Sequence, residues 1–272
     1  MAQRYVRVKN YQGQTYYGLL QLNRTVVVLD APPWLGGKPT DIILTADSYQ
    51  LLFPSNPSKI IAVGKNYSDH AAEMGTPVPD EPLLFLKPPT TLIAEHQPIY
   101  YPYQSERVDY EGELALIIGQ ETKNCSINQA RQKIWGYTIA NDVTARDLQK
   151  KDGQWTRGKG FDSFCPLGPW IVREINADAK ITTFINQETQ PRQSALLSDM
   201  VFSPEEIVSY ISQIMTLLPG DIILTGTPEG VGPMEIGDRV RVEIEGIGIL
   251  ENHVVAYAQT PSINQENPTL PK

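Results

Sequence analysis

Short apolar runs, separated by clusters of Pro, Gly, Asn and Asp, recur along most of the chain. Runs of four to eight apolar and β-branched residues bounded by such clusters are typical of strands. Three lie in the first 55 residues and eight more between residues 59 and 258: RYVRVKN, TYYGLLQL and TVVVLDA, then KIIAVG, PLLFLKP, ELALIIG, IWGYTIAND, PWIVRE, AKITTFIN, DIILTGT and DRVRVEIEGIGILENHVVAY. The pattern predicts that strands dominate the fold.

Helical signals are few. SINQARQKI begins with Ser126 as an N-cap, and SPEEIVSYISQIMT supplies Ser203 as N-cap, Pro204 at the first helical position and Glu206 as the capping-box acid. A shorter helical turn is predicted to begin near Ser68. The predicted fold class is therefore mixed α+β and strand-rich, with short helices.

Changes in composition divide the chain into three parts. For residues 1–55 we predict a small N-terminal strand-rich domain. The turn-forming segment APPWLGGKPTD interrupts its strands. The segment LFPSNPS has the composition of a linker, and residues 59–258 predict the main, catalytic domain. Residues 259–272 form a polar, Pro-rich tail that we expect to be extended or poorly ordered.

Composition and charge narrow the class of protein. A hydrophobic content of 41% in 272 residues is ample for a core. The net charge of −8 disfavours nucleic acid and anionic membrane surfaces as partners. No apolar run approaches the roughly 20 residues of a membrane span, and the first ten residues lack a secretory signal, so we expect a cytoplasmic protein. Its two cysteines, Cys125 and Cys165, are too few for a disulfide framework, so we expect both to be reduced thiols. Cys165 is an improbable catalytic nucleophile.

The stretch VDYEGELALIIG raises a chemical question, because it places Glu111 and Glu113 at the head of an apolar run. Residues i and i+2 of a strand point to the same face, so both carboxylates lie on one side. Like charges held so close repel unless a cation lies between them. The alternative is a solvated strand end with the glutamates outside and the apolar residues inside.

A third acid favours the cation site. In GYTIANDVTARDLQ, Asp142 ends an apolar strand, where functional side chains are often presented. Three carboxylates without His or Cys nearby form a hard, all-oxygen site suited to Mg²⁺ or Mn²⁺. Such a site leaves positions free for water and for a chelating substrate.

The segment GKNYSDHAAEMG supplies a candidate base. His70 and Glu73 stand at i and i+3 of the predicted helical turn, so the carboxylate can orient and charge-stabilise the imidazole. This is the outline of a general-base pair. An exposed pair on a helix surface is the alternative interpretation.

Two further segments suit an anionic substrate. TARDLQKKDGQWTRGKGFDSF, a loop-like region, carries Arg146, Gln149 and Lys159, and its cations suit a carboxylate-bearing ligand unless they belong to a solvated charged loop. PGDIILTGTPEGVG lacks the order of a phosphate loop, so Thr225 and Thr227 are hydroxyl contacts or turn residues.

Taken in order, these motifs resemble those of the fumarylacetoacetate hydrolase family. The matching segments span about residues 59–255: VGKNYSDHAAEMG, PLLFLKPPT, VDYEGELALIIG, GYTIANDVTARDLQ, GKGFDSFCPLGPWIV and PGDIILTGTPEGVG. Six motifs in family order are far more specific than any one of them. The first 55 residues resemble only the short N-terminal extension that many members carry.

The resemblance implies a fold, a metal and a set of site residues. The fold would be a fumarylacetoacetase-like β-roll with short helices, commonly assembled as a homodimer. Mg²⁺ or Mn²⁺ would be held by Glu111, Glu113 and Asp142. The remaining implied residues are the dyad His70 and Glu73, the active-site Lys159, the substrate-side Gln149, the turn hydroxyl of Thr227, and Arg146, which either contacts substrate or supports Asp142.

The resemblance also implies a reaction class, in which a small 2-oxo acid chelates the metal and its enolate is stabilised. Hydrolysis of a C–C bond in an acylpyruvate, such as acetylpyruvate or fumarylpyruvate, is the first prediction. Decarboxylation or tautomerisation of oxaloacetate and isomerisation of 2-hydroxyhepta-2,4-diene-1,7-dioate are the alternatives. A non-catalytic binding protein would lack part of the set, yet His70, Glu73 and Lys159 are all present. A purely structural protein fits the ordered motifs least.

Overall fold

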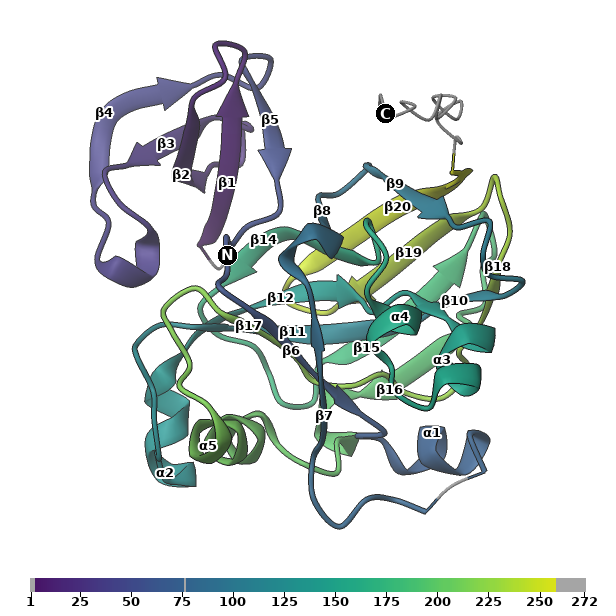
Figure 1. Ribbon diagram of the computed structural model, residues 1–272. Helices are drawn as coiled ribbons and strands as arrows, with labels where there is room; N and C mark the ends of the chain where they lie inside the picture. Colours follow the sequence, from purple (N-terminus) through teal and green to yellow (C-terminus); the bar gives the residue numbers. More distant parts are fainter. Residues whose placement is uncertain (1–2, 76, 258–272) are drawn as a thin grey trace, which may run out of the picture.

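A computed structural model describes residues 3–75 and 77–257 of the chain. The predicted polar tail, residues 259–272, lies outside the described residues. Strands dominate, with a few short helices, so the mixed, strand-rich fold class is confirmed (Figure 1). Among the described residues, no helix is long and apolar enough to cross a membrane.

The N-terminal strands form a separate lobe in Figure 1. Its strands are β1 (Arg4–Asn10), β2 (Thr15–Leu20), β3 (Val26–Leu29), β4 (Pro39–Leu44) and β5 (Tyr49–Leu52). Val6 and Val8 alternate with more exposed residues on β1, as expected for a sheet with one buried face. Strand β4 was not predicted, because its side chains are mostly exposed and leave no apolar alternation. The lobe joins the main sheet where β1 pairs with β14.

A long sheet forms the centre of the molecule. After β1 its strand order continues through β14 (Cys165–Val172), β12 (Ile134–Asn141), β11 (Gly112–Ile118), β17 (Ile222–Leu224), β6 (Ile60–Gly64) and β7 (Leu83–Lys87), with β8 (Leu92–Ile93) against β14. Every residue of β11 is buried. Leu114 and Leu116 enter one core cluster, while Ala115 and Ile117 enter another. Both faces of the sheet are therefore covered at this strand.

Two smaller sheets complete the fold. The first has the order β16 (Gln193–Leu196), β15 (Lys180–Ile185), β19 (Arg239–Ile244), β20 (Gly248–Ala256) and β9 (Pro98–Tyr101). The second has the order β13 (Thr144–Ala145), β10 (Val108–Tyr110) and β18 (Gly232–Met234). The largest core cluster contains residues of β11, β15, β19 and β20, so the main core lies between the central and five-stranded sheets.

The helices are short. They are α1 (Ser68–Glu73), α2 (Ile127–Ala130), α3 (Arg146–Asp152), α4 (Thr156–Lys159) and α5 (Pro204–Ile214), with 3-10 turns η1 (Pro33–Leu35), η2 (Pro89–Thr91), η3 (Arg131–Lys133) and η4 (Leu197–Asp199). Figure 1 shows α2 and α5 together at one end of the molecule and α4 within the main domain, in front of its strands. The predicted capping box of α5 is present, since Ser203 Oγ accepts from the Glu206 N–H and Ser203 N–H donates to Glu206 Oε2. The prediction of a loop-like region after Asp142 is wrong, because this segment forms the two short helices α3 and α4. Leu148 is the one buried apolar residue of α3, too little for a helical period.

Candidate active site

Three buried carboxylates meet where strand β11 begins and strand β12 ends. Glu111 follows β10, Glu113 lies on β11, and Asp142 follows β12. The antiparallel pairing places Gly112 opposite Asn141, and the Asp142 N–H donates to the Glu111 carbonyl oxygen at 2.8 Å. One ligand oxygen from each carboxylate lies within 4.8 Å of the others. The structure thus brings together the three predicted ligands, and the alternative of solvated glutamates is wrong.

The backbone of Gly112, at the start of β11 between the two glutamates, is held by residues of other segments. A Cβ on Gly112 would collide with Thr183 Oγ1, so only glycine fits between the carboxylates. Gly112 N–H donates to Gln193 Oε1 at 2.9 Å, and its carbonyl accepts from Thr227 Oγ1 at 2.9 Å. Thr227 Oγ1 in turn accepts from Gln193 Nε2 at 2.7 Å. The Thr227 hydroxyl lines the site, but its proton goes to the backbone that positions the glutamates.

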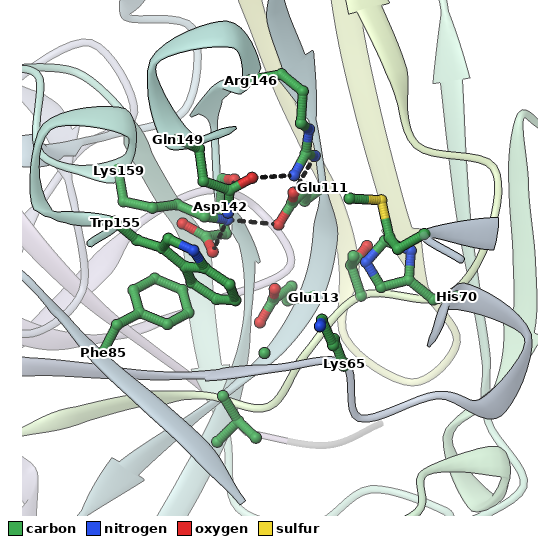
Figure 2. A pocket seen from close by; sticks show the side chains of 14 residues that line it. Lys65, His70, Phe85, Glu111, Glu113, Asp142, Arg146, Gln149, Trp155 and Lys159 are labelled. Atoms are coloured by element: carbon green, nitrogen blue, oxygen red, sulfur yellow. Dashed lines mark hydrogen bonds and ion pairs between the residues drawn. The ribbon is translucent and has the colours of Figure 1, made fainter. Parts of the chain in front are cut away.

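Two buried lysines neutralise the triad from one side. Lys159 Nζ donates to Glu111 Oε2 at 2.6 Å and to Asp142 Oδ2 at 2.5 Å (Figure 2). Lys87 Nζ lies 2.6 Å from Asp142 Oδ1. The sequence interpretation missed Lys87; its one signal was a lysine at the end of the apolar strand PLLFLKP, and it proves to be 1% exposed. A buried lysine needs such a partner.

Arg146 holds the other side of the triad. Its guanidinium donates to Asp109 Oδ2 at 2.8 Å, to Gln149 Oε1 at 2.7 Å and to Glu111 Oε1. Burial alone would lower the pKa of Arg146, but the facing carboxylates of Glu111 and Asp109 raise it above its usual value. The side chain is thus committed to Glu111 and Gln149, and does not contact Asp142.

Charge is unevenly compensated within the triad. Burial alone would raise the pKa of Glu111, yet Lys159 and Arg146 lower it well below the usual range. Burial and the nearby charges of Asp142 and Glu111 instead raise the pKa of Glu113 well above its usual range. Within the described residues, the Glu113 carboxylate accepts a hydrogen bond from Gly226 N–H at 2.7 Å and forms no ion pair. Glu113 is therefore a buried acid that no cation among the described residues pairs with directly, although the nearby charge of Lys159 partly offsets the rise in its pKa.

This arrangement fits a divalent metal. Although Lys87 is near Asp142 Oδ1, that oxygen accepts no hydrogen bond from the described residues, so charge alone holds the pair. A cation among Glu111, Glu113 and Asp142 would relieve the repulsion that raises the pKa of Glu113. The donors are all carboxylate oxygens, which Mg²⁺ and Mn²⁺ prefer.

The predicted dyad faces the same pocket from α1. His70 Nδ1 lies 3.1 Å from Glu73 Oε2, and the Glu73 carboxylate accepts from Gly230 N–H. His70 is 5% exposed and lines the pocket with the triad (Figure 2). Because Nδ1 is turned to Glu73, Nε2 is the nitrogen left for a substrate. The alternative of an exposed surface pair is wrong for His70.

A small cavity of about 40 Å³ joins these groups. Eight of the nine predicted site residues line it, and Glu73 supports His70 from outside the lining. Phe85 and Trp155 form an edge-to-face pair with ring centres 5.1 Å apart on its wall. The sequence interpretation assigned no role to the other six lining residues, which are Val63, Gly64, Lys65, Met74, Phe85 and Trp155.

Neither cysteine belongs to this chemistry. Cys125 and Cys165 are both free and buried. Burial raises the pKa of the Cys165 thiol to about 12, so it stays protonated at neutral pH. The predictions of reduced thiols and of an unreactive Cys165 agree with these positions.

Comparison with known proteins defines the class to which this strand-rich, acid-lined fold belongs. Residues 59–255 match the model of the fumarylacetoacetate (FAA) hydrolase C-terminal domain, and residues 3–54 match an Rv2993c-like N-terminal model. The chain is 42% identical over 227 residues to oxaloacetate tautomerase fahd2, mitochondrial, of Xenopus laevis, covering 78% of this chain and 70% of that protein.

Solved structures agree. The 2-hydroxyhepta-2,4-diene-1,7-dioate isomerase of Mycobacterium marinum superposes with a TM-score of 0.86 at 42% identity, covering 94% of this chain and all of that one. The fumarylpyruvate hydrolase of Pseudomonas aeruginosa, solved with Mn²⁺ and pyruvate, gives 0.70 at 35% identity and covers 76% of this chain and 92% of that one. The chain belongs to the fumarylacetoacetate hydrolase family, as its motifs predicted.

Proposed function

We propose that the protein is a divalent-metal-dependent enzyme that interconverts the keto and enol forms of a small 2-oxo acid, with oxaloacetate as the first candidate. The observation that carries this proposal is the buried triad, whose Glu113 forms no ion pair among the described residues, in one cavity with His70, which Glu73 orients from outside the lining. A metal held there would supply Lewis-acid stabilisation of the negative charge that develops on the C2 oxygen.

The protein's own groups account for the proton transfer. His70 Nε2, oriented through Nδ1 by Glu73, accepts the proton from C3 and then donates it to the C2 oxygen, so that the imidazole returns to its neutral form. Gln149 offers its amide N–H groups to the substrate, because its Oε1 is taken by Arg146. Lys159 places a fixed positive charge beside the carboxylates. The relative that is 42% identical to this chain is named an oxaloacetate tautomerase, which supports oxaloacetate as the first candidate.

Hydrolysis of an acylpyruvate, the first prediction from the sequence, is the second candidate. The observation that favours it is again the dyad, because a His held by a carboxylate can activate water instead of removing a proton. The relative solved with Mn²⁺ and pyruvate is named a fumarylpyruvate hydrolase, which supports this branch. The same residues would then serve attack at a carbonyl carbon.

A substrate panel separates the two candidates. Metal-stripped protein is given oxaloacetate, acetylpyruvate or fumarylpyruvate, each with and without Mg²⁺ or Mn²⁺. Enol absorbance reports tautomerisation, pyruvate released from an acylpyruvate reports hydrolysis, and pyruvate released from oxaloacetate reports decarboxylation. We expect metal-dependent loss of the oxaloacetate enol signal without pyruvate release. Metal-dependent pyruvate release from an acylpyruvate alone would replace the first candidate by the second, and turnover of none would overturn both.

Replacing His70 by Gln should lower kcat by about 10²- to 10⁴-fold, because the proton acceptor is lost. Glu73→Gln should lower kcat less, since His70 keeps its place but loses its charged partner. Stopped-flow enol absorbance measures both rates. Mn²⁺ binding to each variant serves as the control and should match the wild type, because neither residue is among the three carboxylates. Unchanged kcat in His70→Gln would contradict the assignment.

A further inference from the structure

One cation at the mouth of the site has no role in the mechanism above. Lys65 follows strand β6 and lines the cavity, where Figure 2 shows it on the side of Glu113 and His70. It is half-buried and adopts φ 59°, a left-handed conformation that glycine takes without steric cost. A lysine in this position is therefore explained by its side chain rather than by its backbone.

The backbone around Lys65 is firmly held. Asn66 Nδ2 donates to the carbonyl oxygens of Thr225 at 2.8 Å and Phe202 at 3.0 Å, and Asn66 Oδ1 accepts from Phe202 N–H. On the other side, Gly64 pairs with Leu83 in the sheet. These contacts fix where the Lys65 side chain leaves the chain, so its orientation is set before any ligand binds.

Lys65 also differs from the other cations of the pocket by its lack of a partner. Lys159 and Arg146 are each bonded to carboxylates of the site. Lys65 forms no ion pair or hydrogen bond with any residue that the structure describes. An unpaired ammonium in a partly closed cavity is a site for an anion.

The charges indicate which anion. Arg146 pairs with Asp109, which also pairs with the half-exposed Arg107 outside the cavity lining. With these three residues set aside, a divalent ion together with Lys159 and Lys87 would exceed the three negative charges of the triad by one. That single excess matches the one carboxylate of a simple 2-oxo acid. Lys65 adds a second positive charge, which matches a second carboxylate.

We propose that Lys65 binds the distal carboxylate of the substrate and thereby selects 2-oxo dicarboxylates over 2-oxo monocarboxylates. The inference rests on the proposed function, because it assumes that the 2-oxo acid end is held at the triad. It assigns substrate choice to a residue that takes no part in the proton transfer.

Binding to two ligands of equal carbon number tests the proposal. Oxaloacetate and 2-oxobutyrate are titrated by calorimetry into Mg²⁺-loaded wild type, Lys65→Met and Lys65→Arg. In Lys65→Met the Kd for oxaloacetate should rise about 10- to 100-fold, as expected for the loss of a charge-assisted hydrogen bond, and the Kd for 2-oxobutyrate should stay unchanged. Lys65→Arg should keep most of the preference. In turnover, KM for oxaloacetate should rise while kcat changes little.

Lys65→Gly is the matched control for the backbone, because glycine keeps the left-handed φ and removes the side chain. It should behave as Lys65→Met does. Equal weakening of both ligands, or of neither, in these variants would overturn the role of Lys65 and leave the proposed function standing. Failure of wild type to bind either ligand would overturn the proposed function itself, and with it this inference.

Discussion

Lys159→Met should destabilise the metal-free protein by about 3–5 kcal/mol and abolish the metal-dependent activity of the metal-loaded protein. The Lys159 ammonium is buried and bonded to both Glu111 and Asp142, so its loss leaves two buried carboxylates with fewer cations. Methionine keeps the length of the side chain, so the change is mainly one of charge. Urea unfolding in EDTA measures the free energy of unfolding.

Mg²⁺ should restore part of that stability, because a cation at the triad replaces some of the missing positive charge. Lys151→Met, on the exposed end of α3, is the matched control and should change the free energy of unfolding by less than about 0.5 kcal/mol. A loss below about 1 kcal/mol in Lys159→Met would contradict the view that Lys159 neutralises the triad.

Glu113→Gln should have opposite effects on stability and function. Glu113 is 1% exposed, is repelled by Asp142 and Glu111, and forms no ion pair within the described residues. Glutamine removes the charge but can still accept from Gly226 N–H, so the metal-free protein should gain about 1 kcal/mol. Metal-dependent activity should fall at least about 100-fold, because a carboxylate ligand is lost.

Thermal unfolding with and without Mg²⁺ gives the decisive comparison. Wild type should be stabilised by about 2.7 kcal/mol when the ion is at 100 times its Kd, and Glu113→Gln should lose most of this shift. Glu121→Gln, an exposed residue after β11, should leave both values as in wild type. Retention of the full metal shift in Glu113→Gln would show that the ion binds elsewhere.

The three carboxylates could be predicted from the sequence because each stands at a recognisable position in or beside an apolar strand. Glu111 and Glu113 alternate at the start of an apolar run, and Asp142 ends another, so strand geometry alone brings them to one edge. The dyad followed from helical spacing in the same way. Their order along the chain then allowed the family to be recognised.

The supporting residues lie outside such rules. Gln193 reaches Gly112 across 81 positions and Lys87 reaches Asp142 across 55, and neither belongs to a pattern that links it to its partner. Their partners depend on how the sheets pack against one another, and the spacing of apolar residues along the chain carries no information on this packing. The same holds for Thr227, whose hydroxyl was expected near substrate but donates to Gly112.

Elements with few buried residues were missed for a related reason. Strand β4 is mostly exposed and α3 has a single buried apolar residue, so neither has the periodic contrast that identifies a strand or helix. Tertiary contacts to the site determine α3, since Arg146 and Gln149 are among its buried residues. Secondary structure that is stabilised by polar contacts around a charged site is therefore the hardest to predict from the sequence.

The most direct test of the account is a Mn²⁺ titration of metal-stripped protein, with bound ion and oxaloacetate enol conversion followed in the same samples. We predict one ion bound per chain in wild type, with activity rising in proportion to occupancy, and in Glu113→Gln weakened ion binding with activity at least about 100-fold lower. Metal-free wild type that converts the enol as fast as the Mn²⁺-loaded protein, or Glu113→Gln with the wild-type rate, would contradict this prediction.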